Sequence, residues 1–137
     1  VTQTPVSQIK KVIEAQELNL LRTILDAVAI SSELLEYIIR IVSILRKQGD
    51  QSLPVTVQQE IVRGIQYGPG PRAVLSLHRA ARAHALIDGR QSVSPDDIKR
   101  CAPAVLRHRI VLSYEAEAQG IVPDDIIALT LKSVPLP

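Results

Sequence analysis

The sequence contains no phenylalanine, tryptophan or methionine, and its aromatic residues are the three tyrosines Tyr37, Tyr67 and Tyr114. The core must therefore be built from leucine, isoleucine, valine and alanine, of which leucine and alanine are strong helix formers. The single cysteine, Cys101, cannot form an internal disulfide, which favours a reducing intracellular setting. With 46% hydrophobic and 22% charged residues, the composition predicts one globular domain over residues 1–137.

Two further absences concern the membrane and the start of the chain. No apolar run approaches the roughly 18–20 residues of a membrane span, and no signal peptide opens the sequence, so we expect a cytoplasmic protein. Because methionine is absent, we expect the chain to be a fragment of a longer protein. Residues 1–5 are interpreted as part of a preceding linker or as a cloning remnant.

Common catalytic motifs are also missing. The sequence has no GxxxxGK[ST] phosphate loop, no GxGxxG and no HExxH. Nothing places a base beside Cys101, and the acidic pairs at 96–97 and 124–125 follow prolines, where they would cap helices. The three histidines, His78, His84 and His108, do not predict a metal site. His78 and His84 lie six residues apart, which places them on different faces of a helix. We therefore expect neither a catalytic residue nor a metal site in this chain.

Charge is uneven along the chain, although the net charge is only +2. Residues 70–110 carry eight Lys or Arg against three Asp, and residues 111–137 carry one Lys against four acids. Five arginines could share one basic side of the protein: Arg72, Arg79, Arg82, Arg107 and Arg109. This side could be a solvated face, a phosphate-directed cluster or a nucleic-acid surface. We do not expect nucleic acid as a partner, because the region lacks aromatic side chains to stack on bases.

Helical periodicity dominates the first part of the chain. Residues 7–16 place apolar side chains at helical spacing, and Pro5 and Ser7 are a plausible start. Residues 17–30 have the same period and either continue this helix or form a looser segment. The clearest helix is predicted for residues 31–50. Ser31 or Ser32 would cap it, and Gly49 would end it after a last turn that contains Arg46 and Lys47.

The second half has the signals of several shorter helices. Thr56 is expected to cap one, and Gly70 and Pro71 are expected to be the N-cap and N1 residues of another, which ends at Gly89. Its buried stripe is predicted to be Val74, Leu77, Ala81 and Ala85. A helix that starts at Ser94 should break or kink at Pro103. Two more are predicted at residues 114–120 and 123–133.

Together these segments predict an all-α fold, a small helical bundle. The β-branched residues at Val93 and 110–112 could add a minor two-stranded ribbon. Arg72 is unexpected in this arrangement, since it lies in the first turn of a predicted helix. A cation there is disfavoured by a few tenths of a kcal/mol up to about 1, because it meets the positive end of the helix dipole.

Five motifs in order make the sequence resemble one family. They are GPGPRA at 68–73, a Gly-Arg pair at 89–90, VSPDD at 93–97, PAVLRHR at 103–109 and EAEAQG at 115–120. With SELLEYIIRIVSILR at 32–46, this pattern resembles the C-terminal helical lid of the MoxR family of AAA+ ATPases, from about Val6 to Ile127. Pro69 stands where the family often has alanine.

The resemblance implies a role for Arg72. It would be the sensor 2 arginine, which reaches from the lid to the phosphates of ATP bound by the large domain, with Gly70 and Pro71 holding its turn. ATP and Mg²⁺ are implied for the parent ATPase, whereas this chain alone is not expected to bind either tightly or to hydrolyse ATP. Implied partners are the N-terminal AAA+ core of the same chain, a ring that is usually a hexamer, and a von Willebrand factor A-domain protein. The implied role is remodelling or chaperoning of other proteins.

One alternative belongs to another class of protein. The chain could be a free-standing helical protein-interaction module without nucleotide chemistry. The absence of both methionine and the Walker motifs favours a piece of a longer ATPase over this module.

Overall fold

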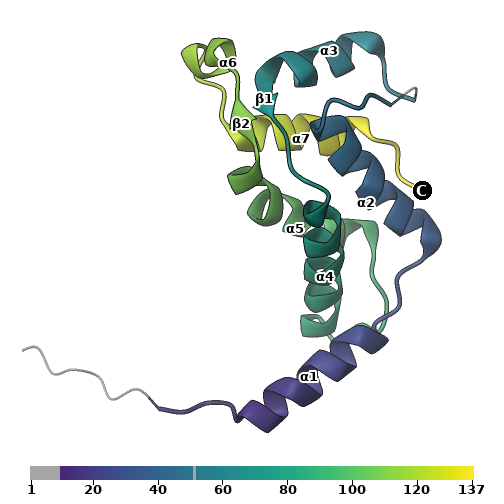
Figure 1. Ribbon diagram of the computed structural model, residues 1–137. Coiled ribbons are helices and arrows are strands. Elements are labelled where there is room, and N and C mark those ends of the chain that lie inside the picture. Colours follow the sequence, from purple (N-terminus) through teal and green to yellow (C-terminus); the bar gives the residue numbers. More distant parts are fainter. Residues whose placement is uncertain (1–9, 51) are drawn as a thin grey trace, which may run out of the picture.

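The computed structural model describes residues 10–50 and 52–137, which form seven α-helices, a short 3-10 helix and a two-stranded ribbon (Figure 1). The predicted all-α bundle with a minor ribbon is confirmed. Over the described ranges, no helix is long and apolar enough to cross a membrane. The elements are α1 (Ala15–Ala27), α2 (Ser32–Leu45), α3 (Val55–Gly64), β1 (Ile65–Tyr67), α4 (Arg72–Ile87), α5 (Pro95–Leu106), η1 (Arg107–Arg109), β2 (Val111–Leu112), α6 (Tyr114–Ala118) and α7 (Pro123–Ser133).

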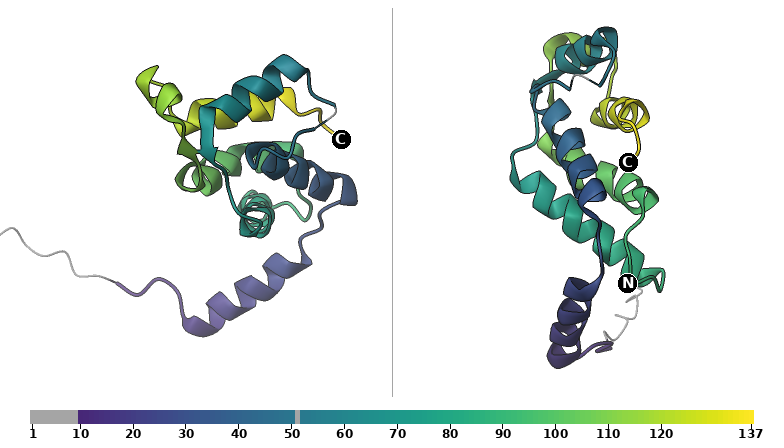
Figure 2. Two further views of the ribbon diagram at one scale, coloured as in Figure 1. Left: turned by 45° about the horizontal axis from the view of Figure 1, so that its top comes forward. Right: turned by 90° about the vertical axis from the view of Figure 1, so that its right-hand side faces the viewer.

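The bundle is organised around α4 and α5, which pack along each other (Figure 2). Helix α2 packs on α4, and α7 packs on both α5 and α2. The stripe of α4 that faces its neighbours is fully buried at Ala73, Leu77, Ala81 and Ala85. Its small alanines allow the helix axes to approach closely. Val74, which the sequence placed on this stripe, is only half-buried, and Ala73 occupies the buried position instead.

Helix α2 is the predicted long helix, with a different end. Ser31 is its N-cap and accepts a hydrogen bond from the Leu34 amide. The helix stops at Leu45 and not at Gly49, because Lys47 adopts the left-handed conformation with φ 63°. The amides of Lys47 and Gln48 donate to carbonyls of the last helical turn, which is the Schellman arrangement normally found with glycine. Arg46 and Lys47 therefore follow the helix and do not lie in its last turn.

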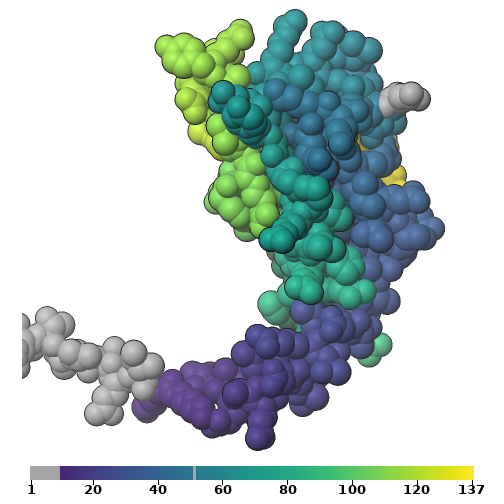
Figure 3. Space-filling model, viewed as in Figure 1, coloured from purple at the N-terminus to yellow at the C-terminus, as the bar shows by residue number. Residues whose placement is uncertain are grey.

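Helix α1 projects from the foot of the molecule (Figure 3) and buries none of its residues. The helix predicted at residues 7–16 is wrong over 10–14, which are not helical, and residues 7–9 lie outside the described part of the chain. The physical reason is a capping box, in which the Glu14 amide donates to the Glu17 carboxylate over 2.7 Å and fixes the helix start. The segment at 17–30 is helical as far as Ala27.

Helix α3 starts two residues earlier than the capping pattern indicated. Its N-cap is Pro54, and Thr56 lies inside the helix without capping it. The side chain of Gln58 closes the preceding loop, because its amide donates to the Leu53 carbonyl over 3.1 Å. This hydrogen bond from Gln58 fixes the loop at the start of α3, a task that the sequence predicted for a Thr56 cap.

The ribbon is antiparallel, with Ile65 opposite Leu112 and Tyr67 opposite Val111. The prediction for residues 110–112 is confirmed for 111 and 112, but the proposed partner Val93 is wrong. Val93 is buried in the core next to Ser92, which forms an isolated bridge with Ala29. The true partner, β1, follows α3 directly and has only three residues, too few to show a strand period.

Helix α5 passes through Pro103 and ends at Leu106, so the predicted break is wrong. A proline inside a helix costs about 3 kcal/mol or more, through a lost hydrogen bond and a steric clash. Packing offsets that cost here, since α5 lies between α4 and α7 and its Ile98, Ala102 and Leu106 are fully buried. Helices α6 and α7 confirm the predictions at 114–120 and 123–133.

Candidate functional site

The turn that leads into α4 is held by a very close contact between backbones. Gly68 lies against the end of α2, and a Cβ atom added to it would be 1.9 Å from the Leu45 carbonyl oxygen. Only glycine fits this approach without a shift of the backbone. Pro69 is buried, and Pro71 already has helical dihedrals, φ −57° and ψ −29°. The start of α4 is therefore fixed relative to α2.

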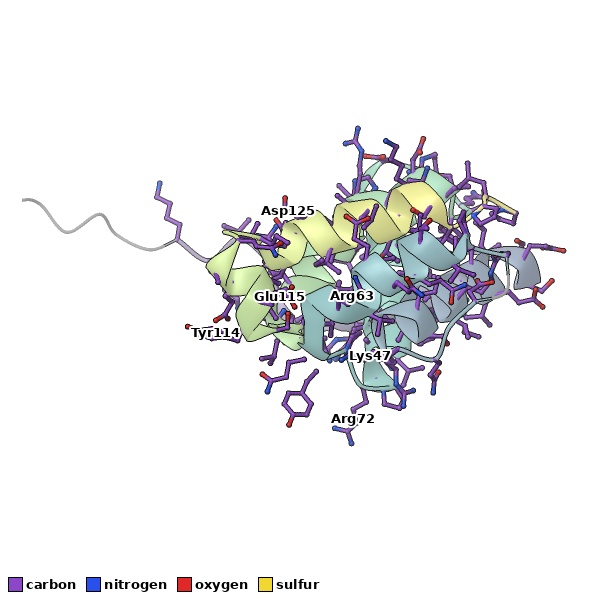
Figure 4. All side chains as sticks on the ribbon, turned by 90° about the horizontal axis from the view of Figure 1, so that it is seen from above. Lys47, Arg63, Arg72, Tyr114, Glu115 and Asp125 are labelled. Atoms are coloured by element: carbon purple, nitrogen blue, oxygen red, sulfur yellow. The ribbon has the colours of Figure 1, made fainter. Side chains whose placement is uncertain are left out.

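Arg72 is the first residue of α4, and Pro71 is the N-cap. The sequence predicted Gly70 as the N-cap and Pro71 as the first residue, so the observed helix starts one position later. Its side chain is exposed and points away from the body of the molecule (Figure 4). Within residues 10–50 and 52–137, its guanidinium forms no ion pair with a carboxylate. This arginine is therefore held at a defined place with its charge unpaired.

The backbone amides at this helix start are largely used already. The amides of Ala73 and Val74 donate to the carbonyls of Gly70 and Pro71 over 2.9 and 3.1 Å, and proline has no N–H group. The dipole still favours an anion in front of α4, but most of the hydrogen bonds to it must come from the Arg72 side chain.

A second chain segment supports the first turn of α4. The Arg109 guanidinium donates to Ser76 Oγ over 3.2 Å, and Ser76 Oγ donates to the Arg72 carbonyl over 3.0 Å. These contacts tie η1 to the residue that carries the exposed cation. Leu75, one turn after Arg72, is 64% exposed, and Tyr67 at the end of β1 is 67% exposed. An exposed cation is thus accompanied by exposed apolar side chains on the elements that form the turn.

The other arginines of the predicted basic side have different surroundings. Arg107 forms a two-pronged ion pair with Asp124, and Arg109 is bonded to Ser76 and to the Val105 carbonyl. Arg82 is half-buried, and its Nε is buried without a partner in the described residues. Arg79 alone resembles Arg72, since it is exposed on the same helix. The sequence therefore overestimated the size of the basic cluster.

The acidic pair at 96–97 does more than cap α5. The Asp97 side chain is 1% exposed and accepts hydrogen bonds from the Ser94 amide and hydroxyl, at 2.7 and 2.9 Å. It also binds both Nη atoms of Arg90 and lies 2.7 Å from His84 Nδ1. The Arg90 guanidinium is the main reason why the pKa of Asp97 lies well below its usual range. We call Asp97, Arg90 and His84 the α4–α5 clamp.

The clamp explains the Gly-Arg pair of the sequence pattern. Gly89 has φ 72° and ends α4, and the next residue, Arg90, is thereby turned back toward α5. His84, Asp88 and Asp97 place ligand atoms within 4.8 Å of one another, a spacing that could suit a metal ion. The Arg90 guanidinium, however, pairs with the carboxylates of both Asp88 and Asp97 and already supplies the positive charge that a metal ion would bring. Sequence reasoning missed this clamp because its residues were explained one by one.

Two remaining candidate groups have shifted pKa values. Burial, followed by the nearby Asp97 charge, raises the pKa of the Cys101 thiol, so the thiolate is disfavoured at neutral pH. Burial lowers the pKa of His78, and the neighbouring Arg82 and Arg79 lower it further. Both shifts favour the neutral form of the side chain.

This bundle, with a fixed turn and an exposed arginine at the start of α4, is the fold of an AAA lid domain. The family description "AAA lid domain" matches residues 58–129, which is more than half of the chain, and the chain belongs to that family. The matched region contains Arg72 and the clamp.

Individual relatives carry the MoxR name. The chain is 34% identical to "Chaperone MoxR1" of Mycobacterium tuberculosis, over 95% of this chain and 33% of that protein. It is 39% identical to "Protein MoxR" of Methylorubrum extorquens, over 62% of this chain and 24% of that protein. A crystal structure described as a "putative ATPase" from Cytophaga hutchinsonii superposes with a TM-score of 0.79 and 36% identity, covering 89% of this chain and 36% of the other. The chain thus spans about a third or less of these proteins.

Proposed function

We propose that residues 1–137 form the lid of a MoxR-type AAA+ ATPase, in which Arg72 is the sensor 2 arginine. The proposal rests on one observation above all. Arg72 is an exposed cation at the start of α4 that forms no ion pair with any described residue, in a turn fixed by the contact between Gly68 and α2. A guanidinium presents a rigid fork of N–H donors that matches phosphate oxygens.

The residues at this site fit the phosphates of ATP and not the metal. The Arg72 guanidinium would donate to phosphate oxygens, and a Cβ atom at Gly70 would meet nothing within 4 Å, so the turn leaves open space beside it. Mg²⁺ prefers oxygen ligands such as carboxylates, so it would be held by the large domain. When bound, ATP supplies the phosphoanhydride bond that is hydrolysed.

Arg72 then has two tasks in this proposal. It stabilises negative charge on the phosphates, and it makes the position of the lid depend on whether they are present. The contacts to Gly68 and Ser76 transmit that position to the whole bundle, since they join α4 to α2 and η1. In the cytoplasm, within a ring that is usually a hexamer, such motion would remodel partner proteins, with a von Willebrand factor A-domain protein as one candidate.

The test compares Arg72→Ala and Arg72→Lys with Arg79→Ala, an exposed arginine two turns along the same helix. In the full-length ATPase, Arg72→Ala should lower the hydrolysis rate by about tenfold or more. Arg72→Lys should recover only part of it, because the forked donor set is lost. Arg79→Ala should retain the rate, and an unchanged rate in Arg72→Ala would contradict the assignment.

A stability measurement separates function from folding. In the isolated chain, Arg72→Ala should leave the thermal midpoint unchanged or raise it slightly. The reason is that the change removes a cation from the positive end of the helix dipole, an interaction that costs a few tenths of a kcal/mol, up to about 1. The isolated wild-type chain should show no ATP turnover above background. A large loss of stability in Arg72→Ala would mean that the arginine is structural.

A further inference from the structure

A groove of about 600 Å³ lies between α3, α6 and α7. Figure 4 shows Arg63, Glu115 and Asp125 around this space, whereas Arg72 points away from the body at a different edge. The volume lies within the range of about 300–1,000 Å³ that is typical of ligand and side-chain pockets. Because Arg72 lies at a different edge, covering the Arg72 side of the domain would leave the groove open.

The floor of the groove is aliphatic. Ile126 and Leu129 of α7 line it, together with Ala116 of α6 and Ile121 of the loop between them. Ile126 and Ala116 are buried, whereas Ile121 and Leu129 are half-buried and offer the apolar surface. It also depends on the last residue of α3, since a Cβ atom at Gly64 would lie 2.6 Å from Ile126 Cδ1. Glycine at this position lets α3 lie directly against α7 and forms one wall. An apolar side chain inserted here would be removed from water on several sides, which favours binding.

The rim of the groove is acidic, although the whole chain is basic. Three acids, Glu60 of α3, Glu115 of α6 and Asp125 of α7, and one cation, Arg63, line the groove. In the described parts of the chain, neither Glu60 nor Glu115 forms an ion pair. Asp125 accepts a hydrogen bond from the Val122 amide and also lines the rim. Three carboxylates against one guanidinium leave a negative rim around an apolar floor. Two of the three, Glu115 and Asp125, lie in residues 111–137, where the sequence has one Lys against four acids.

We propose that this groove binds a basic amphipathic segment of a partner protein. Its apolar side chains would cover Ile121 and Leu129, the two half-buried residues of the floor, and its lysines or arginines would pair with Glu60 and Glu115. Complementary charge of this kind orients a partner and speeds its association. Because the groove does not include Arg72, the proposal does not depend on the sensor 2 assignment.

A second copy of this chain is the competing occupant. Residues 10–13, Lys-Lys-Val-Ile, are exposed and combine basic with apolar side chains. Lys11, however, already pairs with Glu14, and residues 10–17 carry two lysines and two glutamates. That segment has no net positive charge to match the rim, so charge complementarity favours a different protein.

The probe is a fluorescein-labelled helical peptide of about 16 residues, with leucines on one face and lysines on the other. One control peptide carries glutamate in place of each lysine, and another has the same composition in scrambled order. Fluorescence anisotropy with the 137-residue chain should show saturable binding of the lysine peptide. Binding should weaken between about 0.05 and 0.2 M salt, because the pairs lie on the rim.

Variants locate the binding. The double change Glu60→Gln and Glu115→Gln should weaken the affinity for the lysine peptide by about tenfold or more. The control changes Asp26→Asn and Glu36→Gln, at exposed acids on α1 and α2, should alter that affinity less than about twofold. Amide shifts in NMR spectra should fall on 59–64 and 116–129. Equal binding of the glutamate or scrambled peptide, shifts elsewhere, or no binding at millimolar peptide would overturn the proposal. Sedimentation in which the Glu60 and Glu115 changes dissolve a dimer would overturn it in favour of a second copy.

Discussion

Asp97→Asn is the change that most directly tests how the bundle is held together. The Asp97 carboxylate is buried and joins the end of α4 to the start of α5 through Arg90, His84 and Ser94. Asparagine has nearly the same shape and keeps one oxygen acceptor, but its NH₂ group must face donors where an oxygen stood. The variant therefore removes charge and acceptors without opening a cavity.

The magnitude follows from the contacts that are lost. The capping hydrogen bond between the Ser94 amide and the Asp97 carboxylate contributes about 1 kcal/mol, and each hydrogen bond to a charged group contributes about 1.5–3 kcal/mol. Part is recovered because the Arg90 side chain is 38% exposed and can return to water. We expect the free energy of unfolding to fall by about 2–3 kcal/mol, which for a domain of this size lowers the thermal midpoint by about 10 °C.

Urea unfolding and thermal melts measure this loss, with Asp96→Asn as the matched control. Asp96 lies in the same first turn of α5 but is exposed, so its removal should cost less than about 1 kcal/mol through the helix dipole. Equal effects of the two changes would refute the clamp, since a general dipole effect would then explain both.

The pH dependence gives a second readout. Arg90 lowers the pKa of Asp97 in the folded protein, so the carboxylate form is the one that folding favours. The clamp's contribution is therefore complete above the unfolded-state pKa of about 3.9 and is lost as the pH falls below it. The stability difference between wild type and Asp97→Asn should shrink in acid. A difference that stayed constant to pH 3 would contradict this account.

Two further predictions concern the turn and the thiol. Gly68→Ala should destabilise the chain by about 2 kcal/mol or more, because the new Cβ meets the Leu45 carbonyl, whereas Gly70→Ala should cost less than about 0.5 kcal/mol. Denaturant melts of the pair check this, and similar melts would disprove the close contact. The Cys101 thiol should react with a disulfide reagent slowly at neutral pH, because burial and then Asp97 raise its pKa above the ordinary 9.0. Its rate profile should shift to lower pH in Asp97→Asn, and an unshifted profile would show that the Asp97 charge does not act on it.

The sequence predicted best where a local rule and the tertiary structure agree. Ser31, Ser94 and Gly89 cap their helices as expected, because each cap uses only neighbouring residues. It failed where packing between distant segments opposed the local rule. Pro103 is tolerated because α4 and α7 enclose α5, and Lys47 replaces Gly49 in the left-handed position that ends α2.

The candidate site could be predicted only in part for the same reason. The place of Arg72 in the first turn of a helix could be predicted to within one position, since proline and glycine mark the turn. What holds the turn was not, because Leu45 and Arg109 come from elements more than twenty residues away on either side. The clamp was also hidden, since an acidic pair after Ser-Pro has a sufficient local explanation as a cap.

Local electrostatics give the last argument for treating Arg72 as functional. Helices α1, α2, α5, α6 and α7 each have an acidic residue in the first turn, where it stabilises the helix dipole. Helices α3 and α4 have none there, and of these two only α4 begins with an arginine. Stability alone would favour an acid at this place too, and sequences that break a local rule tend to do so at functional sites. An anion in front of α4 would reverse the sign of the effect, because both the dipole and the guanidinium would then attract it.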